Sequence, residues 1–117
     1  MFYTGSYMAQ SRDEQLPREV IMQLEELGQR VRTARIRRRM STEELAQACD
    51  IGRRTLYRLE NGEPGVAMGT FMSVLWTLGL LDTVSGVANP DSDEHGKILE
   101  AAIRPQRVRT PSPDNDF

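Results

Sequence analysis

Residues 41–63 read STEELAQACDIGRRTLYRLENGE, and this stretch predicts two short helices joined by a tight turn. Ser41 opens the first helix with a capping box, Ser-Thr-Glu-Glu, in which the last glutamate stands three residues after the serine. Asp50-Ile51-Gly52 forms the turn, and a second helix is expected over about residues 53–60. Asn61-Gly62 ends it, because both residues accept the left-handed conformation.

The second of these helices separates apolar from basic side chains. At about 100° per residue, Leu56 and Leu59 face inward. The opposite arc has no acidic residue and consists of Arg53, Arg54, Tyr57 and Arg58. Like charges four residues apart cost about 0.2–0.5 kcal/mol in a free helix, whereas one bidentate arginine–guanine contact discriminates between bases by about 1–3 kcal/mol. The alternative is a solvated face whose arginines meet acids from elsewhere in the chain.

The charge of the chain is distributed unevenly. The net charge is −2, which alone argues against a polyanionic partner. Between Gly28 and Gly62, however, nine arginines accompany four acids, while the flanks before and after carry net charges of −3 and −4. Arginine offers a planar fork of donors that suits phosphate and guanine. A basic centre between acidic flanks therefore indicates nucleic acid as the partner of this segment.

Outside this stretch, the spacing of apolar residues predicts an all-α fold of about five helices with flexible tails. A long amphipathic helix is expected over roughly residues 17–39, weakened or split at Gly28, and further helices over 68–78, 80–87 and from a Ser92 cap to 103. The predicted organisation is a disordered tail at 1–16, a DNA-binding domain at 17–88, a helical extension at 89–103 and a flexible tail at 104–117.

Helix, turn and outward-facing basic helix together define a helix-turn-helix, and residues 41–63 resemble the lambda-repressor-like, XRE/Cro-type family of that motif. The resemblance covers about residues 27–81, and its matching residues are Leu45-Ala46, Ile51, Thr55-Leu56 and Leu59-Glu60-Asn61-Gly62. It implies a lambda-repressor-like bundle. Two residues depart from the pattern: Asp50 stands where the family often has glycine in the turn, and Gly52 where it often has a serine or threonine cap.

The resemblance also implies roles for individual residues. Arg53, Arg54 and Arg58 occupy positions where the family reads base edges, and Thr42 a position where it touches phosphate. The full predicted DNA-binding set is Thr42, Arg53, Arg54, Thr55, Tyr57 and Arg58. An internal ion pair is implied between Arg35 and Glu60, which we expect to be structural rather than to contact DNA.

These features predict a sequence-specific, autoregulatory transcriptional repressor that reads the major groove of its operator as a homodimer. An apolar strip is assigned to the dimer contact, with packing inside the monomer as the alternative: Leu80, Leu81, Val84 and Val87. Trp76 is expected in the core or in this interface. The alternative function is a protein-interaction module of the same fold that binds a partner protein without DNA.

The wider sequence is also similar to HipB-like antitoxins. The similarity lies in the stretch from Leu27 through Gly65-Val66 to Leu81, in Asn89-Pro90 and in the basic ending from Arg104 to Arg109. It implies a HipA-like kinase toxin as a protein partner.

Other classes of protein are disfavoured by the residues that are missing. The sequence has no nucleophile–base pair and no phosphate-cradling glycine loop, so we expect no enzyme. His95 and Cys49 are each the single residue of their kind, so we expect neither a metal site nor a cofactor. No apolar stretch approaches the about 20 residues that cross a bilayer, and no secretory signal is evident, so a cytoplasmic location without membrane contact is expected.

Overall fold

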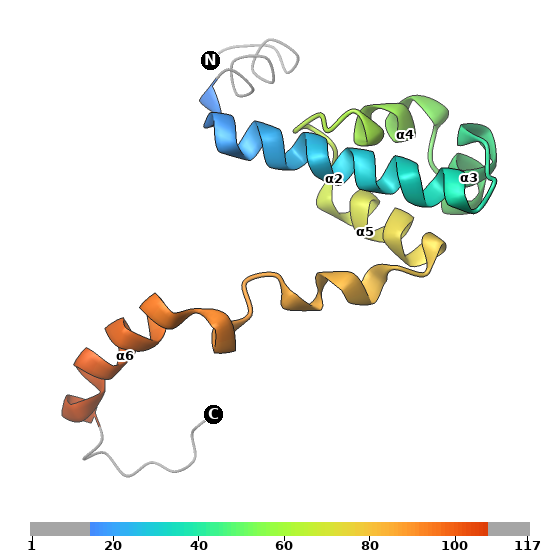
Figure 1. Cartoon of the computed structure of the whole chain (residues 1–117). Helices are drawn as coiled ribbons and strands as arrows, with labels where there is room; N and C mark the ends of the chain where they lie inside the picture. Colours follow the sequence, from blue (N-terminus) through green and yellow to red (C-terminus); the bar gives the residue numbers. More distant parts are fainter. Residues whose placement is uncertain (1–14, 108–117) are drawn as a thin grey trace. The chain divides into compact units, whose positions relative to one another are not determined.

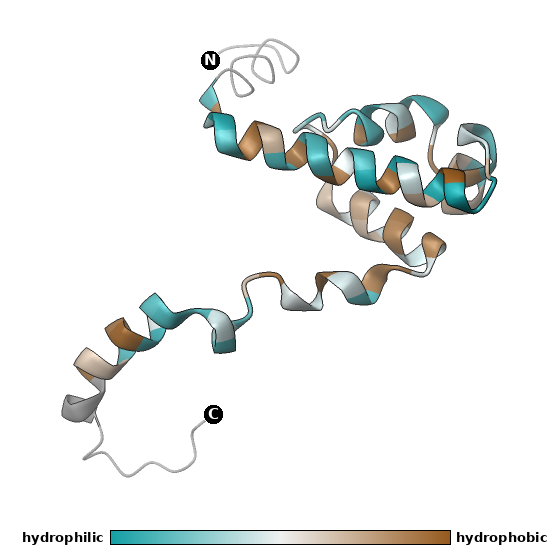
Figure 2. Cartoon of the chain, viewed as in Figure 1, coloured by the Kyte–Doolittle hydropathy of each residue, from teal (hydrophilic) through white to brown (hydrophobic). Residues whose placement is uncertain are grey.

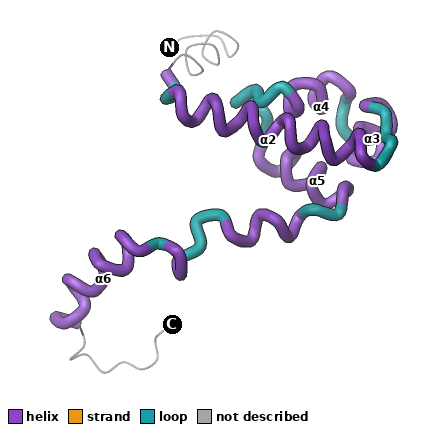
Figure 3. The backbone as a smooth tube through the Cα atoms, in the orientation of Figure 1, coloured by secondary structure: helices purple, strands orange, loops and turns teal. Residues whose placement is uncertain are grey.

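The computed structural model describes residues 15–107 of the 117-residue chain, with side chains up to residue 103. Within this range the chain forms helices, turns and loops but no strand (Figure 3), so the predicted all-α fold class is confirmed. The chain divides into two compact units, with the division between Asp82 and Thr83. No described helix is long and apolar enough to cross a membrane. The tails expected at 1–16 and 104–117 lie largely outside the described residues, and the predicted domain boundaries stay predictions.

Helices α2 (Arg18–Arg37), α3 (Thr42–Cys49), α4 (Arg53–Glu60) and α5 (Met68–Leu78) build the first unit. Both α2 and α3 pack against α4 and α5, so the four helices share one core. Figure 1 shows α4 and α5 on opposite sides of the long α2. The helix predicted over residues 17–39 is one unbroken helix, and those predicted over 53–60 and 68–78 have the observed bounds.

The core of this unit comes from one stripe on each helix. Leu45, Leu56 and Val74 have no exposed surface, and the complete set of buried apolar side chains is Val31, Ala34, Leu45, Ala46, Leu56, Leu59, Val74, Leu75 and Leu78. These residues recur at one-, three- and four-residue spacing, which turns them to a common face of each helix. Figure 2 shows the uncharged α5 as largely brown and white. Trp76 on α5 is 70% exposed and therefore lies outside the core.

The four helices of the first unit end in the same way, at a residue with left-handed backbone. Gly62 and Gly79 have φ angles of 75° and 78° after α4 and α5, while Asp50 has 58° after α3 and Arg39 has 56° after α2. In each case the next backbone N–H donates to the carbonyl five residues before it, which is the bond of a Schellman motif. Glycine adopts this conformation freely, whereas other residues lose roughly 1–2 kcal/mol in it. The motif turns the chain sharply after each helix.

Glycine also allows α4 to approach α2 with no side chain between them. A Cβ at Gly28, in the middle of α2, would lie 2.5 Å from the Glu60 carbonyl oxygen and 2.7 Å from that of Leu59. A Cβ at Gly62 would lie 2.6 Å from the Glu25 Cα. Gly28 therefore does not split α2, and its missing side chain makes room for the end of α4.

The second unit contains the 3-10 helix η2 (Pro90–Ser92) and α6 (Glu94–Arg107), which contact each other. A further 3-10 helix, η1 (Leu81–Gly86), runs across the division between the units and matches the short helix predicted over residues 80–87. The predicted Ser92 cap is wrong, because Ser92 lies in η2. Asp93 does the capping instead, since its Oδ1 accepts the Gly96 N–H at 2.9 Å.

Substitution of Gly28 tests the close approach of α2 and α4. We expect Gly28→Ala to lower the free energy of unfolding by about 1–3 kcal/mol, because the new Cβ overlaps backbone that cannot give way. This loss would occur although alanine is the better helix former by up to about 1 kcal/mol. The measurement is urea unfolding followed by circular dichroism. Gly69→Ala in α5 is the control, because its Cβ would meet nothing within 4 Å, and equal stability of the two variants would contradict the expectation.

Candidate nucleic-acid interface

The segment from α3 to α4 is fixed at its start and in its turn. The Ser41 Oγ accepts the Glu44 N–H at 3.0 Å, and the Glu44 carboxylate accepts the Ser41 N–H at 2.8 Å, so the predicted capping box is formed. In the turn, Asp50 takes the left-handed conformation that glycine would otherwise supply. Gly52 is the N-cap of α4 and contributes no side-chain bond, so α4 starts without a capping hydroxyl.

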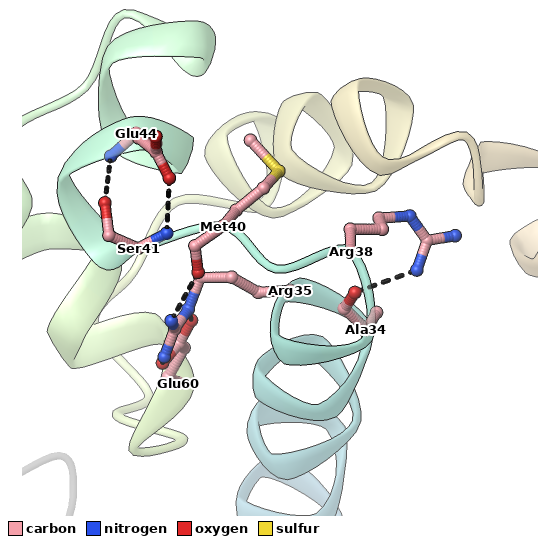
Figure 4. A network of polar contacts seen from close by, with 7 residues as sticks. All are labelled: Ala34, Arg35, Arg38, Met40, Ser41, Glu44 and Glu60. Carbon is pink, nitrogen blue, oxygen red and sulfur yellow. Dashed lines mark hydrogen bonds and ion pairs between the residues drawn. The ribbon is translucent and has the colours of Figure 1, made fainter.

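A buried ion pair ties the other end of α4 to α2. Arg35 Nε lies 2.7 Å from Glu60 Oε2, and Arg35 Nη2 lies 3.1 Å from Glu60 Oε1, a bidentate contact. The third nitrogen, Nη1, donates to the Met40 carbonyl at 2.9 Å. Figure 4 shows the Arg35 guanidinium between Glu60 and Met40, beside the capping box. One arginine thus connects α2, the end of α4 and the chain entering α3.

Both side chains of this pair are almost fully covered, with 10% of Arg35 and 7% of Glu60 exposed. The hydrogen bonds that Arg35 donates to Glu60 raise the pKa of Arg35 against the opposing effect of its burial, so the guanidinium stays charged. Buried charges are costly to strand, and removing one partner of such a pair typically costs about 3–5 kcal/mol. The pair therefore holds α4 in one orientation, and its burial agrees with the structural role expected for both residues.

With Leu56 and Leu59 buried, α4 turns its basic face away from the core. Arg53, Arg54 and Tyr57 are exposed, and Tyr57 has 64% of its surface accessible. Arg58 and Thr55 are half-buried at the margin. The structure thus brings the five α4 residues of the predicted DNA-binding set onto one helix that is anchored from behind.

Acidic side chains from neighbouring segments approach two of the three arginines. Arg58 Nε donates to Glu63 Oε1 at 3.0 Å, with 42% and 46% of the two side chains exposed. Arg53 Nη1 lies 3.9 Å from Glu43 Oε1, with both side chains about two-thirds exposed. Arg54 has no ion pair or side-chain hydrogen bond within the described part of the chain. The alternative interpretation, a solvated face whose arginines meet acids from elsewhere in the chain, therefore holds for Arg53 and Arg58.

The sequence pattern of α4 did not indicate these two acids, because neither of them belongs to that helix. Glu43 comes from the first turn of α3 and Glu63 from the loop after α4, and neither belongs to the α4 arc. Exposed ion pairs contribute a median of about 0–1 kcal/mol. The long Arg53–Glu43 contact can therefore be exchanged for a stronger partner, and the Arg58–Glu63 contact uses only the Nε of Arg58 and leaves its two terminal nitrogens available.

Thr42 is the first residue of α3 and is half-buried. The capping box occupies the backbone N–H groups of Ser41 and Glu44. Among the described residues, the N–H groups of Thr42 and Glu43 have no acceptor. Free N–H groups at the start of a helix suit phosphate oxygens, so this end of α3 has the donors that the predicted phosphate contact needs.

The apolar strip assigned to a dimer contact differs in exposure from residue to residue. Val87 is 73% exposed and Leu81 38% exposed, whereas Leu80 and Val84 are half-buried. The assignment stays a prediction. Within the described residues, no three histidine, cysteine, aspartate or glutamate side chains are grouped so that they could hold a metal ion.

Comparison with known proteins adds one finding to this geometry. The profile of a helix-turn-helix domain family matches residues 26–84, half of the chain. The matched segment contains α3, α4 and α5 and the second half of α2, and it nearly coincides with residues 27–81, over which the XRE/Cro-type resemblance extends. No curated protein and no solved structure was found to match the chain.

Removal of the Glu60 carboxylate tests the anchor of α4. We expect Glu60→Ala to lower the free energy of unfolding by about 3–5 kcal/mol, because Arg35 would be left buried and uncompensated. Thermal and urea unfolding measure the loss. Glu26→Ala is the matched control, since Glu26 pairs with Arg30 on the exposed side of α2 and its loss should cost less than about 1 kcal/mol. Similar destabilisation by both variants would show that burial of the Arg35–Glu60 pair is unimportant.

Proposed function

This chain belongs to the helix-turn-helix domain family and is a DNA-binding regulator, and on that premise we propose that it is a sequence-specific repressor that reads the major groove with α4. The observation that supports this most is the combination in α4 of a buried anchor and an outward arginine face. Glu60 is 6% exposed, whereas Arg53 and Arg54 on the same helix are exposed. The family is typically not enzymatic, and repression needs only that bound protein occludes a promoter, which we propose to be that of its own operon.

Base reading is assigned to the three arginines of α4. Arg54 is exposed and unpaired within the described residues, so it can meet a guanine edge without first losing a partner. Arg58 uses its Nε for Glu63, which leaves its two terminal nitrogens for the O6 and N7 acceptors of guanine. Arg53 stands at the first position of α4, where its weak contact to Glu43 is readily exchanged. Thr55 and Tyr57 complete the proposed contact surface on this helix.

Phosphate binding is assigned to the start of α3. Thr42 and the free backbone N–H groups at the start of α3 can donate hydrogen bonds to a phosphate next to the groove that α4 enters. Such contacts set the register of the protein on the duplex but carry no sequence information. The capping box fixes the backbone at the start of α3, which favours one docking geometry.

A homodimer would double this surface. Two recognition helices read half-sites about 34–36 Å apart, one turn of DNA, when a two-fold axis relates them. We assign the dimer contact to the strip Leu80, Leu81, Val84 and Val87, because exposed aliphatic side chains such as Val87 gain from burial.

A protein partner is a second proposal with its own observation. Among the described residues, α6 exposes Ile98, Leu99 and Ile103, each more than half accessible. Large aliphatic side chains in this state favour a protein contact. The HipB-like similarity makes a HipA-like kinase toxin the partner to test, and the chain would then be its antitoxin. In the alternative function, an interaction module would use such contacts without binding DNA.

Selection from a pool of random duplexes tests DNA reading directly. We expect the full chain to enrich a defined sequence and to bind it with an affinity that falls steeply as salt rises, because phosphate contacts release counterions. Fluorescence anisotropy against a scrambled duplex of equal length gives the specificity ratio. Failure to enrich any sequence, with no salt-dependent binding near 0.1 M, about the physiological range, would favour the interaction module.

Truncation of two α4 arginines tests the assignment of the site. We expect Arg54→Ala and Arg58→Ala each to lower the specificity ratio about tenfold, consistent with about 1–3 kcal/mol per arginine–guanine contact. Circular dichroism should show an unchanged fold, because both side chains lie outside the core. Arg18→Ala is the control: it removes the same charge from the exposed start of α2 and should leave the ratio unchanged. Full specificity in both α4 variants would refute the assignment.

Substitution in the apolar strip tests the dimer. We expect Val87→Asp to shift the full chain from dimer to monomer in sedimentation equilibrium, because a charge cannot be buried there without a partner. Ser85→Asp, an exposed residue of η1 outside the strip, should leave the association unchanged. A monomeric parent chain would rule out the proposed dimer, and an unshifted Val87→Asp variant would rule out this interface.

A further inference from the structure

Glu63 contacts Arg58 through both its backbone and its side chain. Its backbone N–H donates to the Arg58 carbonyl at 3.0 Å, as part of the motif that ends α4. Its Oε1 accepts the Arg58 Nε–H at 3.0 Å. The backbone bond fixes where Glu63 stands relative to Arg58, and the side-chain bond then fixes the plane of the guanidinium. Such a double contact constrains an arginine that would otherwise sample many rotamers.

The loop after α4 also approaches one terminal nitrogen of the same guanidinium. A Cβ at Gly65 would lie 3.2 Å from Arg58 Nη2, so a side chain at this position would require the nitrogen to shift by a few tenths of an ångström. Glu63 holds the Nε edge, and Gly65 passes beside one terminal nitrogen. The remaining donors of Arg58 belong to its Nη1–Nη2 end, which is the end that forms a bidentate contact with guanine.

The other two arginines of α4 lack this arrangement. Arg53 lies 3.9 Å from Glu43 with no hydrogen bond between the two side chains. Arg54 has no side-chain partner among the described residues. Of the three arginines of α4, only Arg58 has a hydrogen-bonded carboxylate partner among the described residues.

We propose that Glu63 is a positioning residue that sets the sequence specificity of Arg58. It holds the guanidinium with its terminal fork free, so that Arg58 meets a guanine edge with little further ordering. Its negative charge also repels nearby phosphates, which lowers affinity for DNA that lacks the matching base. Specificity is a difference between two affinities, and a residue that weakens the wrong complex increases it. This inference rests on the proposed function, in which Arg58 reads a base.

The test compares three acidic-residue variants of the full chain by anisotropy, with the selected duplex and its scrambled counterpart as probes. Removing one negative charge should raise affinity for the scrambled duplex severalfold in Glu63→Ala, Glu63→Gln and Glu43→Ala alike. Only Glu63→Ala should also lower the specificity ratio, by about tenfold, the lower part of the range for one arginine–guanine contact. Glu63→Gln keeps an acceptor for Arg58 Nε and should retain most of the ratio. A ratio in Glu63→Ala no lower than in Glu43→Ala would overturn the proposal.

A double variant separates this inference from the proposed function. The double variant Arg58→Ala/Glu63→Ala should have the same specificity ratio as Arg58→Ala alone, because no guanidinium remains to be positioned. A further drop of the ratio would show that Glu63 acts through another residue and would overturn the proposal. If Arg58→Ala alone leaves the ratio unchanged, base reading by Arg58 fails and this inference fails with it. If Arg58→Ala lowers the specificity ratio as expected and Glu63→Ala does not change it, the positioning role of Glu63 is refuted and the proposed function still holds.

Discussion

The bidentate pair between Arg35 and Glu60 is the interaction on which the rest of the structure depends. It joins the last turn of α2 to the last residue of α4, and through the Met40 carbonyl it also reaches the chain that enters α3. A charge pair in this position tolerates few geometries, because both partners are buried and each must satisfy the other. The apolar core supplies the driving force for folding, but Leu56 and Leu59 alone would allow α4 to rotate or slide. The pair selects one orientation, and that orientation leaves the arginines outside.

The electrostatics of the exposed face follow from what surrounds it. Nine arginines between Gly28 and Gly62 create a local excess of positive charge in a chain that is acidic overall. Glu43 and Glu63 reduce the net positive charge beside the exposed arginines of α4. The contact of Glu43 with Arg53 is long and weak, whereas the hydrogen bond from Arg58 to Glu63 restrains that arginine. The positive charge that this face presents to solvent is therefore smaller than that of its arginines alone.

Much of the fold was predictable because it depends on local pattern. The period of apolar residues located the helices that the structure contains, and the Ser41 box and the Gly62 and Gly79 stops located their ends. The family resemblance led to the residues 35 and 60 that form the ion pair. Contacts between elements were less predictable: neither the α2–α4 approach at Gly28 nor the acids beside Arg53 and Arg58 leave a periodic signal. The left-handed Arg39 was not anticipated, since arginine rarely occupies that conformation.

The seam between α2 and α4 has one more consequence. At Gly28 and Gly62 the two helices meet through main-chain atoms, so their separation there is set by peptide groups, which every amino acid shares. Exchanges among Leu, Ile, Val and Met elsewhere in the core can alter how closely the other helices pack. They do not change the distance between α2 and α4 at these two glycines. Divergence of the core during evolution would therefore leave the distance between α4 and α2 unchanged. New binding preferences could then arise from replacements on the exposed face of α4 alone.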